Sequence, residues 1–432
     1  MLRQDAEDRI QSELADLIRR AEAREAQLAA KTMRRRAPLP LRYWRQDAHF
    51  TTPASDEAMA RKAVEKGTEP VGRMMDRLGV TAAMLAERLQ LAAAQVDALL
   101  ARPRRAPLVM LDGEDAQALR EDVATQGLES AVRVLRDGQW RHALRFYRPR
   151  GLNLPSAARS LVSVLYETGK GIAPANYPLD GIVFPKLETV DELDWLLTTL
   201  DDIEQTLTLE PGRIRVAILI ESGAAAGRLD AIVDRAGQRL CALIFGLVDY
   251  SADLGLSTLS YYHPVAEWAR AEIVNAAGAA GVPAIDAMTV DYPVADPALD
   301  ASANRTRFLD RMELAYRDAV HAREAGMAGK WVGHPAQLFV TLLAFDGAFD
   351  RQALEQEALK LLAYERSERE EGRGATIING VMSDRATDRH ARVLLRRAAA
   401  NGWLDPDRAL ALGVIADSEL VDARAAWQER EE

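Results

Sequence analysis

The sequence predicts an α/β protein built on a (β/α)₈ TIM barrel, with helical segments before the barrel, after its first strand and after its last strand. Three observations favour this fold. Short apolar runs alternate with longer helical stretches, which is typical of a parallel sheet closed into a barrel. The 432 residues leave room for a barrel of about 250 residues and for extensions. No repeat with a period of about 20 to 50 residues is present, which disfavours a solenoid or a propeller.

The charge balance and the composition exclude several classes of protein. The 65 acidic and 55 basic side chains leave a formal net charge of −10, whereas a protein held by nucleic-acid phosphates normally presents a basic face. Apolar residues make up 48% and charged residues 28%, which excludes a disordered or collagen-like chain. We therefore expect no nucleic-acid partner and a large buried core.

The chain contains one cysteine, Cys241, so an intrachain disulfide and a cysteine-based zinc site are excluded. Residues 1–36 carry charges at nearly every turn and lack the apolar segment of a secretory signal. The longest apolar runs, such as 241–248, are far shorter than the roughly 20 residues that a membrane-spanning helix needs. These features predict a cytoplasmic protein with no membrane partner.

Residues 1–40 form the predicted N-terminal helical extension. Its apolar residues lie three, four or seven positions apart, so they share one side of a highly charged helix. They are Ile10, Leu14, Leu17, Ile18, Ala21 and Leu28. This stripe needs a partner, which is either the body of the protein or another subunit.

Residues 41–344 form the predicted barrel. Its strands are expected at 48–52, 108–111, 143–148, 181–185, 215–220, 242–246, 284–286 and 331–333. The helices between them carry apolar faces, for example Leu193, Leu196 and Leu197. The alternation of these elements predicts a parallel sheet.

Two segments depart from the alternation. Residues 70–105 are predicted to be a helical insertion between the first two strands. It faintly resembles a helix-turn-helix, but its second helix lacks the basic and amide side chains that read DNA, so we expect a helical pair that packs on the barrel or covers its mouth. Residues 345–432 are predicted to be a helical cap, except for the glycine-containing stretch 372–380.

Polar side chains follow the predicted strands, at the end of the barrel where such enzymes place their chemistry. A single carboxylate there is often only a helix N-cap. Glu221 and Asp249 each follow a continuous apolar strand, and two convergent carboxylates with water are the usual way of holding Mg²⁺. An all-oxygen site favours Mg²⁺ or Mn²⁺ over Zn²⁺.

Six segments in order carry a family resemblance. They are Leu-Asp-Gly-Glu-Asp-Ala at 111–116, the arginine strand at 143–148, Gly-Ile-Val-Phe-Pro-Lys-Leu-Glu at 181–188, Ile-Leu-Ile-Glu-Ser at 218–222, Phe-Gly-Leu-Val-Asp-Tyr-Ser-Ala-Asp-Leu-Gly at 245–255 and Gly-Lys-Trp-Val-Gly-His-Pro-Ala-Gln at 329–337. In this order the chain resembles the citrate lyase β-subunit and malyl-CoA lyase superfamily (HpcH/HpaI-type aldolases), over roughly residues 43–398.

The resemblance implies a Mg²⁺-dependent carbon–carbon lyase. By motif position, Glu221 and Asp249 are its metal ligands. Glu114 and Asp115 match an acidic pair that supports the metal waters and a neighbouring arginine. The family pattern Arg-x-Asn-Gly-Leu is closest to 148–152, with Arg150 in place of the asparagine, so Arg148 is the first candidate for the catalytic arginine and Arg145 the second.

The segment 372–384 is similar to the acyl-CoA lyase segment that ends Asp-Gly-x-Met-Ile-Asp, with departures at Asn379 and Ser383. In those enzymes the final acid enters the active site of an adjacent subunit, which by position is Asp384 here. The resemblance thus implies a homo-oligomer, a trimer or hexamer, with a glycine-rich arm that crosses between subunits. The competing interpretation is a surface loop in which Asp384 caps the following helix.

The implied reaction cleaves or forms a β-hydroxyacyl-CoA thioester, with a 2-oxo acid and an acyl-CoA as partners. Asp384 would move a proton at the enolate carbon and the arginine would stabilise the enolate oxygen. Lys186 is a weaker candidate for a Schiff-base amine and is expected to pair with Glu114 or Glu221. The alternatives are a CoA-independent class II hydroxy-oxo-acid aldolase, in which His49 is a possible base, and a catalytically lapsed interaction protein of the same fold.

Overall fold

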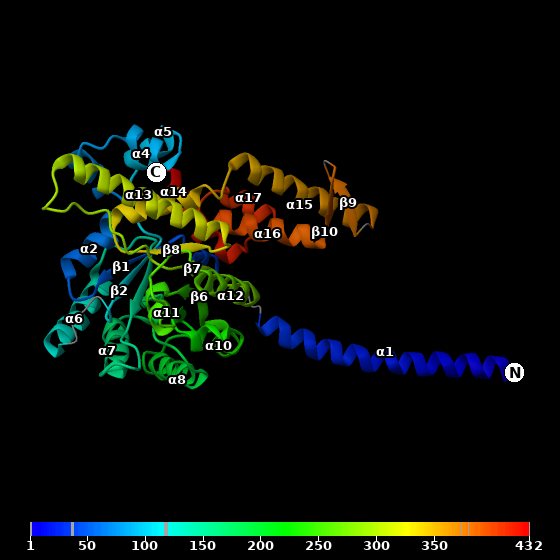
Figure 1. The fold of residues 1–432 in the computed structure, drawn as a ribbon. Helices are drawn as coiled ribbons and strands as arrows, with labels where there is room; N and C mark the ends of the chain where they lie inside the picture. Colours follow the sequence, from blue (N-terminus) through cyan, green and yellow to red (C-terminus); the bar gives the residue numbers. More distant parts are fainter. Residues whose placement is uncertain (1, 36–38, 116–119, 373, 379, 432) are drawn as a thin grey trace.

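The computed structural model describes residues 2–35, 39–115, 120–372, 374–378 and 380–431 (Figure 1). Its centre is a closed barrel of parallel strands in the order β1 to β8, in which β1 pairs with both β2 and β8. Helices surround the barrel, so the predicted TIM-barrel fold is confirmed. The division into 1–40, 41–344 and 345–432 stays a prediction.

The barrel strands are β1 (Ala48–Pro53), β2 (Leu108–Asp112), β3 (Leu144–Arg148), β4 (Gly181–Phe184), β5 (Arg215–Ile220), β6 (Leu240–Phe245), β7 (Ala284–Asp286) and β8 (Gly329–Val332). The helices that follow them are α2 (Glu57–Lys66), α6 (Glu121–Asp137), α7 (Ala157–Gly169), α8 (Val190–Thr206), α9 (Gly223–Ala226), α10 (Leu229–Ala236), α11 (Leu247–Asp253), α12 (Pro264–Ala280), α13 (Ala301–Glu324) and α14 (Pro335–Asp346).

Every predicted strand is present, and two of them begin earlier than the sequence suggested. β6 begins at Leu240, which pairs with Val216. β8 begins at Gly329, and its second residue, Lys330, is a charged residue opposite Asp286. The sequence did not predict this start, because a buried strand is recognised by an apolar run and Lys330 is charged.

The insertion consists of α3 (Pro70–Leu78), α4 (Ala82–Leu89) and α5 (Ala93–Ala101), so the predicted helical pair has a third helix. It packs against the outer helices α13 and α14. Arg88 of α4 contributes by forming ion pairs with Asp310 and Glu313 of α13. Of the two predicted roles, packing on the barrel is therefore the one that these contacts support.

The C-terminal region comprises α15 (Arg351–Glu371), the hairpin β9 (Ala375–Ile378) and β10 (Val381–Asp384), α16 (Arg385–Ala400), α17 (Pro406–Ala411) and α18 (Leu420–Glu431), with the 3₁₀ turn η4 (Asp417–Glu419). Its helices enclose a second apolar core that includes Leu41 of η1 (Leu41–Trp44), ahead of β1. The backbone N–H of Leu41 also donates to Glu419 at 2.9 Å. The segment just before the first barrel strand is thereby joined to the C-terminal region.

The glycine-containing stretch leads into the β9–β10 hairpin, and its predicted crossing to another subunit stays a prediction. Thr376, Ile377 and Ile378 favour an extended backbone because their side chains branch at Cβ. Gly380 supplies the positive φ of 79° at the turn. Asn379 lies outside the described residues.

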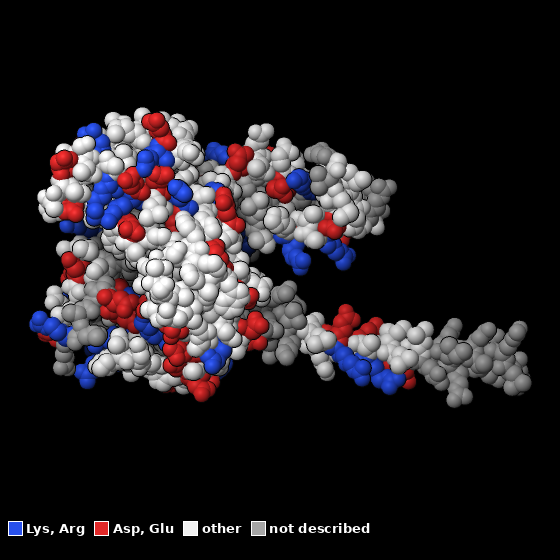
Figure 2. All heavy atoms as spheres, in the orientation of Figure 1, with Lys and Arg blue, Asp and Glu red and all other residues white. Residues whose placement is uncertain are grey.

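The N-terminal helix α1 (Leu2–Arg35) extends away from the barrel (Figure 1). Its described apolar side chains are exposed, from 47% at Ile18 to 65% at Leu28, so they do not use the body of the protein as a partner. Acidic and basic side chains are interleaved on the face of the molecule seen in Figure 2. Among the described helices, none is both long and apolar enough to cross a membrane.

Candidate active site

The ends of five consecutive strands, β2 to β6, bring polar side chains together at the carboxyl end of the barrel. Asp112 and Arg148 end β2 and β3 and stand opposite each other in the register of these strands. Tyr147 bonds to Ser160 of the outer helix α7, so its neighbour Arg148 points to the barrel interior. Glu221 directly follows β5, and Glu114 and Asp115 follow β2. This position is where TIM-barrel enzymes carry out their chemistry.

The Arg148 guanidinium is the centre of the first half of the site. Its Nε and Nη2 donate to the two carboxylate oxygens of Asp112 at 2.7 and 2.6 Å. Its remaining nitrogen, Nη1, lies 3.5 Å from Glu114 Oε2 and 3.2 Å from Asp115 Oδ2. The side chain is only 3% exposed. Burial opposes the charge, but Asp112 and then Glu114 outweigh it and raise the pKa of Arg148, so the arginine remains a fixed cation.

Two carboxylates converge on one cation in the second half of the site. The Lys186 ammonium lies 2.6 Å from Asp249 Oδ1 and 3.4 Å from Glu221 Oε2. The backbone N–H of Lys186 donates to Glu221 Oε1 at 2.6 Å, from a left-handed backbone with φ of 52° that is uncommon outside glycine. Gly246 also matters, because a Cβ there would lie 2.6 Å from Glu221 Cβ. The backbone thus brings Glu221 and Asp249 to a shared point.

Burial perturbs both glutamates. It raises the pKa of Glu221 to about 7, although Lys186 opposes this shift. It raises the pKa of Glu114 to about 8, against the effect of Arg148 and with a contribution from Asp115. Shifts of this kind are frequent where carboxyl groups are arranged for proton transfer or cation binding.

The arrangement suits a divalent cation better than an imine mechanism. Burial opposes the charge of Lys186, but Glu221 and Asp249 raise its pKa, whereas a Schiff-base amine must be neutral. Glu221 and Asp249 already share one cation, and their oxygens are hard ligands that suit Mg²⁺ or Mn²⁺. Among the residues that the structure describes, no cluster of three or more His, Cys, Asp or Glu side chains is present as a ready metal site. A metal here would be held by the two carboxylates, and Lys186 would move.

The structure does not bring Arg145 to this group. Arg145 lies three residues before Arg148 on β3, and side chains an odd number of positions apart point to opposite faces of a strand. Its backbone N–H donates to Asp180 at 2.8 Å, at the opposite end of the barrel. Arg148 is therefore the arginine that the geometry associates with Glu114, Glu221 and their neighbours.

His49, which the sequence offered as a possible base, and two polar residues at strand ends, His334 and Asp286, also lie apart from the site. His49 is buried in the barrel, where its Nε2 lies 2.8 Å from Gln46 Oε1 and burial lowers its pKa to about 3. His334 caps α14, because its Nδ1 accepts from the backbone of Ala336. Asp286 ends β7 but is fully buried against Arg270 of the outer helix α12, at 2.7 Å. None of these three contacts Glu221 or Asp249 within the described part of the chain.

Asp384 lies at the end of β10 and is the N-cap of α16. Its Oδ1 accepts hydrogen bonds from the backbone of Ala386 and Thr387 at 2.9 and 3.0 Å. The Thr387 N–H is the main cause of a lowered pKa for Asp384, which is consequently ionised at neutral pH. Among the described residues of one chain, Asp384 makes no hydrogen bond or ion pair with the barrel site, and its action on another subunit stays a prediction.

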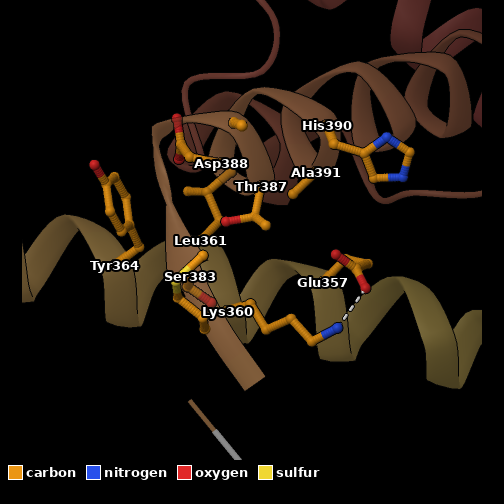
Figure 3. Close-up of a pocket in the computed structure, with 11 residues that line it drawn as sticks. Glu357, Lys360, Leu361, Tyr364, Ser383, Thr387, Asp388, His390 and Ala391 are labelled. Atoms are coloured by element: carbon orange, nitrogen blue, oxygen red, sulfur yellow. Dashed lines mark hydrogen bonds and ion pairs between the residues drawn. The ribbon is translucent and has the colours of Figure 1, made fainter. Parts of the chain in front are cut away.

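Next to Asp384, the hairpin and two helices enclose a cavity of about 340 Å³ (Figure 3). Figure 3 shows Glu357, Lys360 and Tyr364 on α15 facing Thr387 and Asp388 on α16. Lys360 and Glu357 form an ion pair at 2.7 Å. Met382 of β10 also lines the cavity and is 62% exposed. The hairpin therefore presents apolar surface next to the helix that Asp384 caps.

Sequence reasoning did not assign roles to Asp112 and Trp331. Asp112 makes the bidentate contact with Arg148, and the Trp331 ring lies 5.1 Å from the Arg148 guanidinium carbon. The Nε1 of Trp331 is buried without a hydrogen-bond partner among the described residues. The sequence could have predicted the contact with Asp112, because Asp112 ends the predicted strand that precedes the strand of Arg148. The contact with Trp331 depends on barrel closure, which a sequence does not display.

Comparison with known proteins agrees with this geometry. The family described as "Domain of unknown function (DUF6986)" matches residues 45–428. The chain belongs to this family. The chain is also similar to proteins with named activities. An L-malyl-CoA/beta-methylmalyl-CoA lyase of Rhodobacter capsulatus is 27% identical to it, over 68% of this chain and 87% of the relative. A citrate lyase subunit beta of Leuconostoc mesenteroides subsp. cremoris is 24% identical, over 69% and 88%.

A solved structure gives the same fold for this DUF6986 protein. A citrate lyase of Burkholderia xenovorans LB400 aligns with a TM-score of 0.56 and 20% identity, over 85% of this chain and 95% of that chain. Together with the sequence relatives, it confirms that the chain belongs to the citrate lyase β-subunit and malyl-CoA lyase superfamily. The prediction of an enzyme of the carbon–carbon lyase class is confirmed at that level.

Proposed function

We propose that this DUF6986 protein is a Mg²⁺- or Mn²⁺-dependent lyase that cleaves or forms a β-hydroxyacyl-CoA thioester, in the manner of a malyl-CoA or citramalyl-CoA lyase. The products of cleavage are a 2-oxo acid and an acyl-CoA. The observation that carries the proposal is the convergence of Glu221 and Asp249 on one cation beside the buried Arg148. The similarity to malyl-CoA lyases over two thirds of the chain supports the CoA thioester as substrate.

During cleavage the hydroxyl oxygen carries negative charge as it loses its proton and becomes the carbonyl of the 2-oxo acid, and the electron pair of the breaking carbon–carbon bond passes to the enolate oxygen of the acyl-CoA fragment. When bound, a divalent ion supplies a Lewis acid and a template for the oxygens of the oxo acid. Arg148 stabilises the enolate oxygen of the thioester fragment through Nη1, because Asp112 occupies its other two donor positions. Glu114 is largely protonated at neutral pH, which reduces the negative charge that competes for Nη1.

A proton must also be exchanged at the enolate carbon. We assign this step to Asp384 of an adjacent subunit in a homo-oligomer, a trimer or hexamer. Its lowered pKa makes it a carboxylate at neutral pH, which suits proton removal in the condensation direction. The exposed apolar hairpin that ends at Asp384 supports an intersubunit position, since Ile377 and Met382 are 75% and 62% exposed in the single chain.

Metal titration of variants tests the proposal. We expect Mg²⁺ binding by calorimetry to be lost or strongly weakened in Glu221→Gln and Asp249→Asn. Asp253→Asn is the matched control, because Asp253 is on the same helix as Asp249 but its carboxylate bonds to the backbone of Gly223. Unchanged Mg²⁺ binding in both site variants would exclude these ligands.

A substrate screen separates this function from its alternatives. CoA thioesters of hydroxy acids and the free hydroxy acids are tested with and without Mg²⁺. We expect metal-dependent cleavage of a thioester only. Cleavage of a free acid would identify a CoA-independent aldolase, whereas the absence of turnover on every substrate would favour a lapsed enzyme that acts through its surface.

A further inference from the structure

The end of the barrel opposite the active site contains an unexpected concentration of arginine. Here η1, the loop before β3 and the helices α16 and α18 enclose a cavity of about 270 Å³. The charged and imidazole side chains that line it are Arg42, Arg45, Arg141, His142, Arg145 and Asp422. Four guanidinium groups thus face one carboxylate, in a chain whose net charge is −10.

The acids around this cavity neutralise only part of its charge. Arg42 forms an ion pair with Asp180 at 2.7 Å, and Arg45 forms one with Glu429. Asp180 is also the carboxylate nearest to Arg213, at 4.0 Å, so it is shared. Asp422 is the acid among the residues that line the cavity, and two of the four lining arginines form no ion pair with Asp180 or Glu429.

Those two arginines are Arg141 and Arg145. Neither forms an ion pair with any carboxylate of the described residues, and Arg145 is half-buried. Burial, followed by repulsion from Arg42 and Arg213, lowers the pKa of Arg145 despite the attraction of Asp180. The Trp140 ring lies 5.8 Å from the Arg145 guanidinium carbon, but no carboxylate of the described residues pairs with it, and Arg141 is exposed beside it. Both guanidinium groups are therefore free to bind an anion that enters the cavity.

The backbone at Arg141 adds an independent observation. Arg141 has a φ of 49°, in the left-handed region that residues other than glycine adopt rarely. Lys186 shares this property at the active site, with a φ of 52°. Gln90, Ser156 and Thr208 share it at helix ends, whereas Arg141 and Lys186 each lie beside a cluster of charged side chains.

We propose that this cavity, formed by Arg42, Arg45, Arg141, His142 and Arg145, binds the phosphate group of a small metabolite. Guanidinium groups reach it from three separate elements, and a tetrahedral phosphate offers oxygens in several directions, whereas a carboxylate offers two in one plane. The volume fits a phosphate with a small attached group. Arg145 and Arg148 are three residues apart on β3, about 10 Å along the strand, so this site is separate from the lyase site.

Calorimetry with inorganic phosphate and pyrophosphate tests the proposal on the full chain, at constant ionic strength and with a chelator present. We expect saturable binding by the unchanged protein. Arg145→Gln and Arg141→Gln should each bind about tenfold more weakly, because each removes charge-assisted hydrogen bonds. The matched control is Arg77→Gln, which removes the same charge from an exposed position on α3 and should bind phosphate normally.

Three results would overturn the proposal. The first is the absence of saturable phosphate binding by the unchanged protein. The second is unaltered binding in Arg141→Gln, an exposed position whose substitution does not disturb the core and which decides the matter if Arg145→Gln fails to fold. The third is equally tight binding of malonate, which would indicate a general dianion site. Because none of these measurements uses lyase activity, their outcome is independent of the proposed function.

Discussion

Arg148 is distinguished by the partners of its three guanidinium nitrogens. Two are committed to Asp112, and the third is directed between Glu114 and Asp115. The sequence alone left Arg145 and Arg148 as alternatives. Strand alternation separates them, since Arg148 shares the interior with Asp112 whereas Arg145 does not. The partner of Arg148 could not be read from the sequence, because it depends on the register between two strands.

The planar fork of Arg148 leads to a prediction about turnover. Arg148→Lys keeps the charge but loses the bidentate contact with Asp112 and the fixed position of Nη1. We expect kcat to fall by about 100-fold, as for loss of one oxyanion donor, with a smaller change in KM. Arg145→Lys is the matched control on the same strand and should retain activity. The reverse pattern would assign catalysis to Arg145.

The position of Lys186 predicts competition with the metal. Its ammonium occupies the point shared by Glu221 and Asp249, so removal of the charge should favour a divalent ion there. We expect Lys186→Met to tighten the Kd for Mg²⁺ by about tenfold in calorimetry. Lys170→Met, at a surface lysine paired with Glu167, should leave the Kd unchanged. Weaker Mg²⁺ binding in Lys186→Met would instead indicate that Lys186 positions the ligands.

The raised pKa of Glu114 predicts a pH-dependent stability. The folded protein holds the proton of Glu114 up to about pH 8, whereas the ordinary pKa of the group is 4.5. This stabilisation is therefore complete below about pH 4.5 and is lost as the pH rises through 8. Urea unfolding with a chelator should show a decline of at most about 1.4 kcal/mol per pH unit from this group. The difference in the free energy of unfolding between the unchanged protein and Glu114→Gln should change between about pH 4.5 and pH 8. A difference that stays constant over this range would contradict the raised pKa of Glu114.

At the scale of elements, the barrel strands were predictable and the hairpin was not. β5 and β7 have the predicted bounds because a strand buried on both faces leaves a continuous apolar run. β9 and β10 have four residues each, and they lie between two helices with Gly374 before β9 and Gly380 in the turn. Such short strands produce no period that separates them from a loop.

The helix α1 allows a test at the same scale. Because the described side chains of α1 from Leu14 to Leu28 are exposed, removal of residues 1–38 should leave Tm unchanged within about 1 °C. Leu41→Ala is a useful comparison, since Leu41 is fully buried in the second core and its truncation should cost about 2–5 kcal/mol. Thermal unfolding measures both. A marked loss of Tm on truncation would mean that α1 packs on the protein in solution.

The whole molecule determines whether one chain is sufficient for activity. Within the described part of a single chain, Asp384 has no contact with the barrel site, and its capping of α16 matches the competing interpretation of this residue. If it acts on another subunit, each active site combines residues from two chains. The barrel and its acids were predictable from motif order, but no single-chain sequence pattern states which subunit completes which site.

Complementation distinguishes the two interpretations of Asp384. Asp384→Ala and Glu221→Gln are each expected to be inactive. Hetero-oligomers isolated with two affinity tags should regain part of the activity, because some sites combine an intact Glu221 with an intact Asp384. Size-exclusion chromatography with light scattering verifies that mixing has occurred. Inactive hetero-oligomers of confirmed composition would mean that Asp384 serves only as a helix cap.

The bond between Leu41 and Glu419 joins residues 378 positions apart in the sequence, and Arg396 bonds to Leu39 O across 357 positions. A nascent chain emerging at about 5–20 residues per second exposes Leu41 for tens of seconds before its partner leaves the ribosome. The second core is thus completed only after Glu419 and Ala423 have been synthesised. Until then Leu41, which is fully buried in the folded protein, lacks apolar side chains of α16 to α18 that share its core.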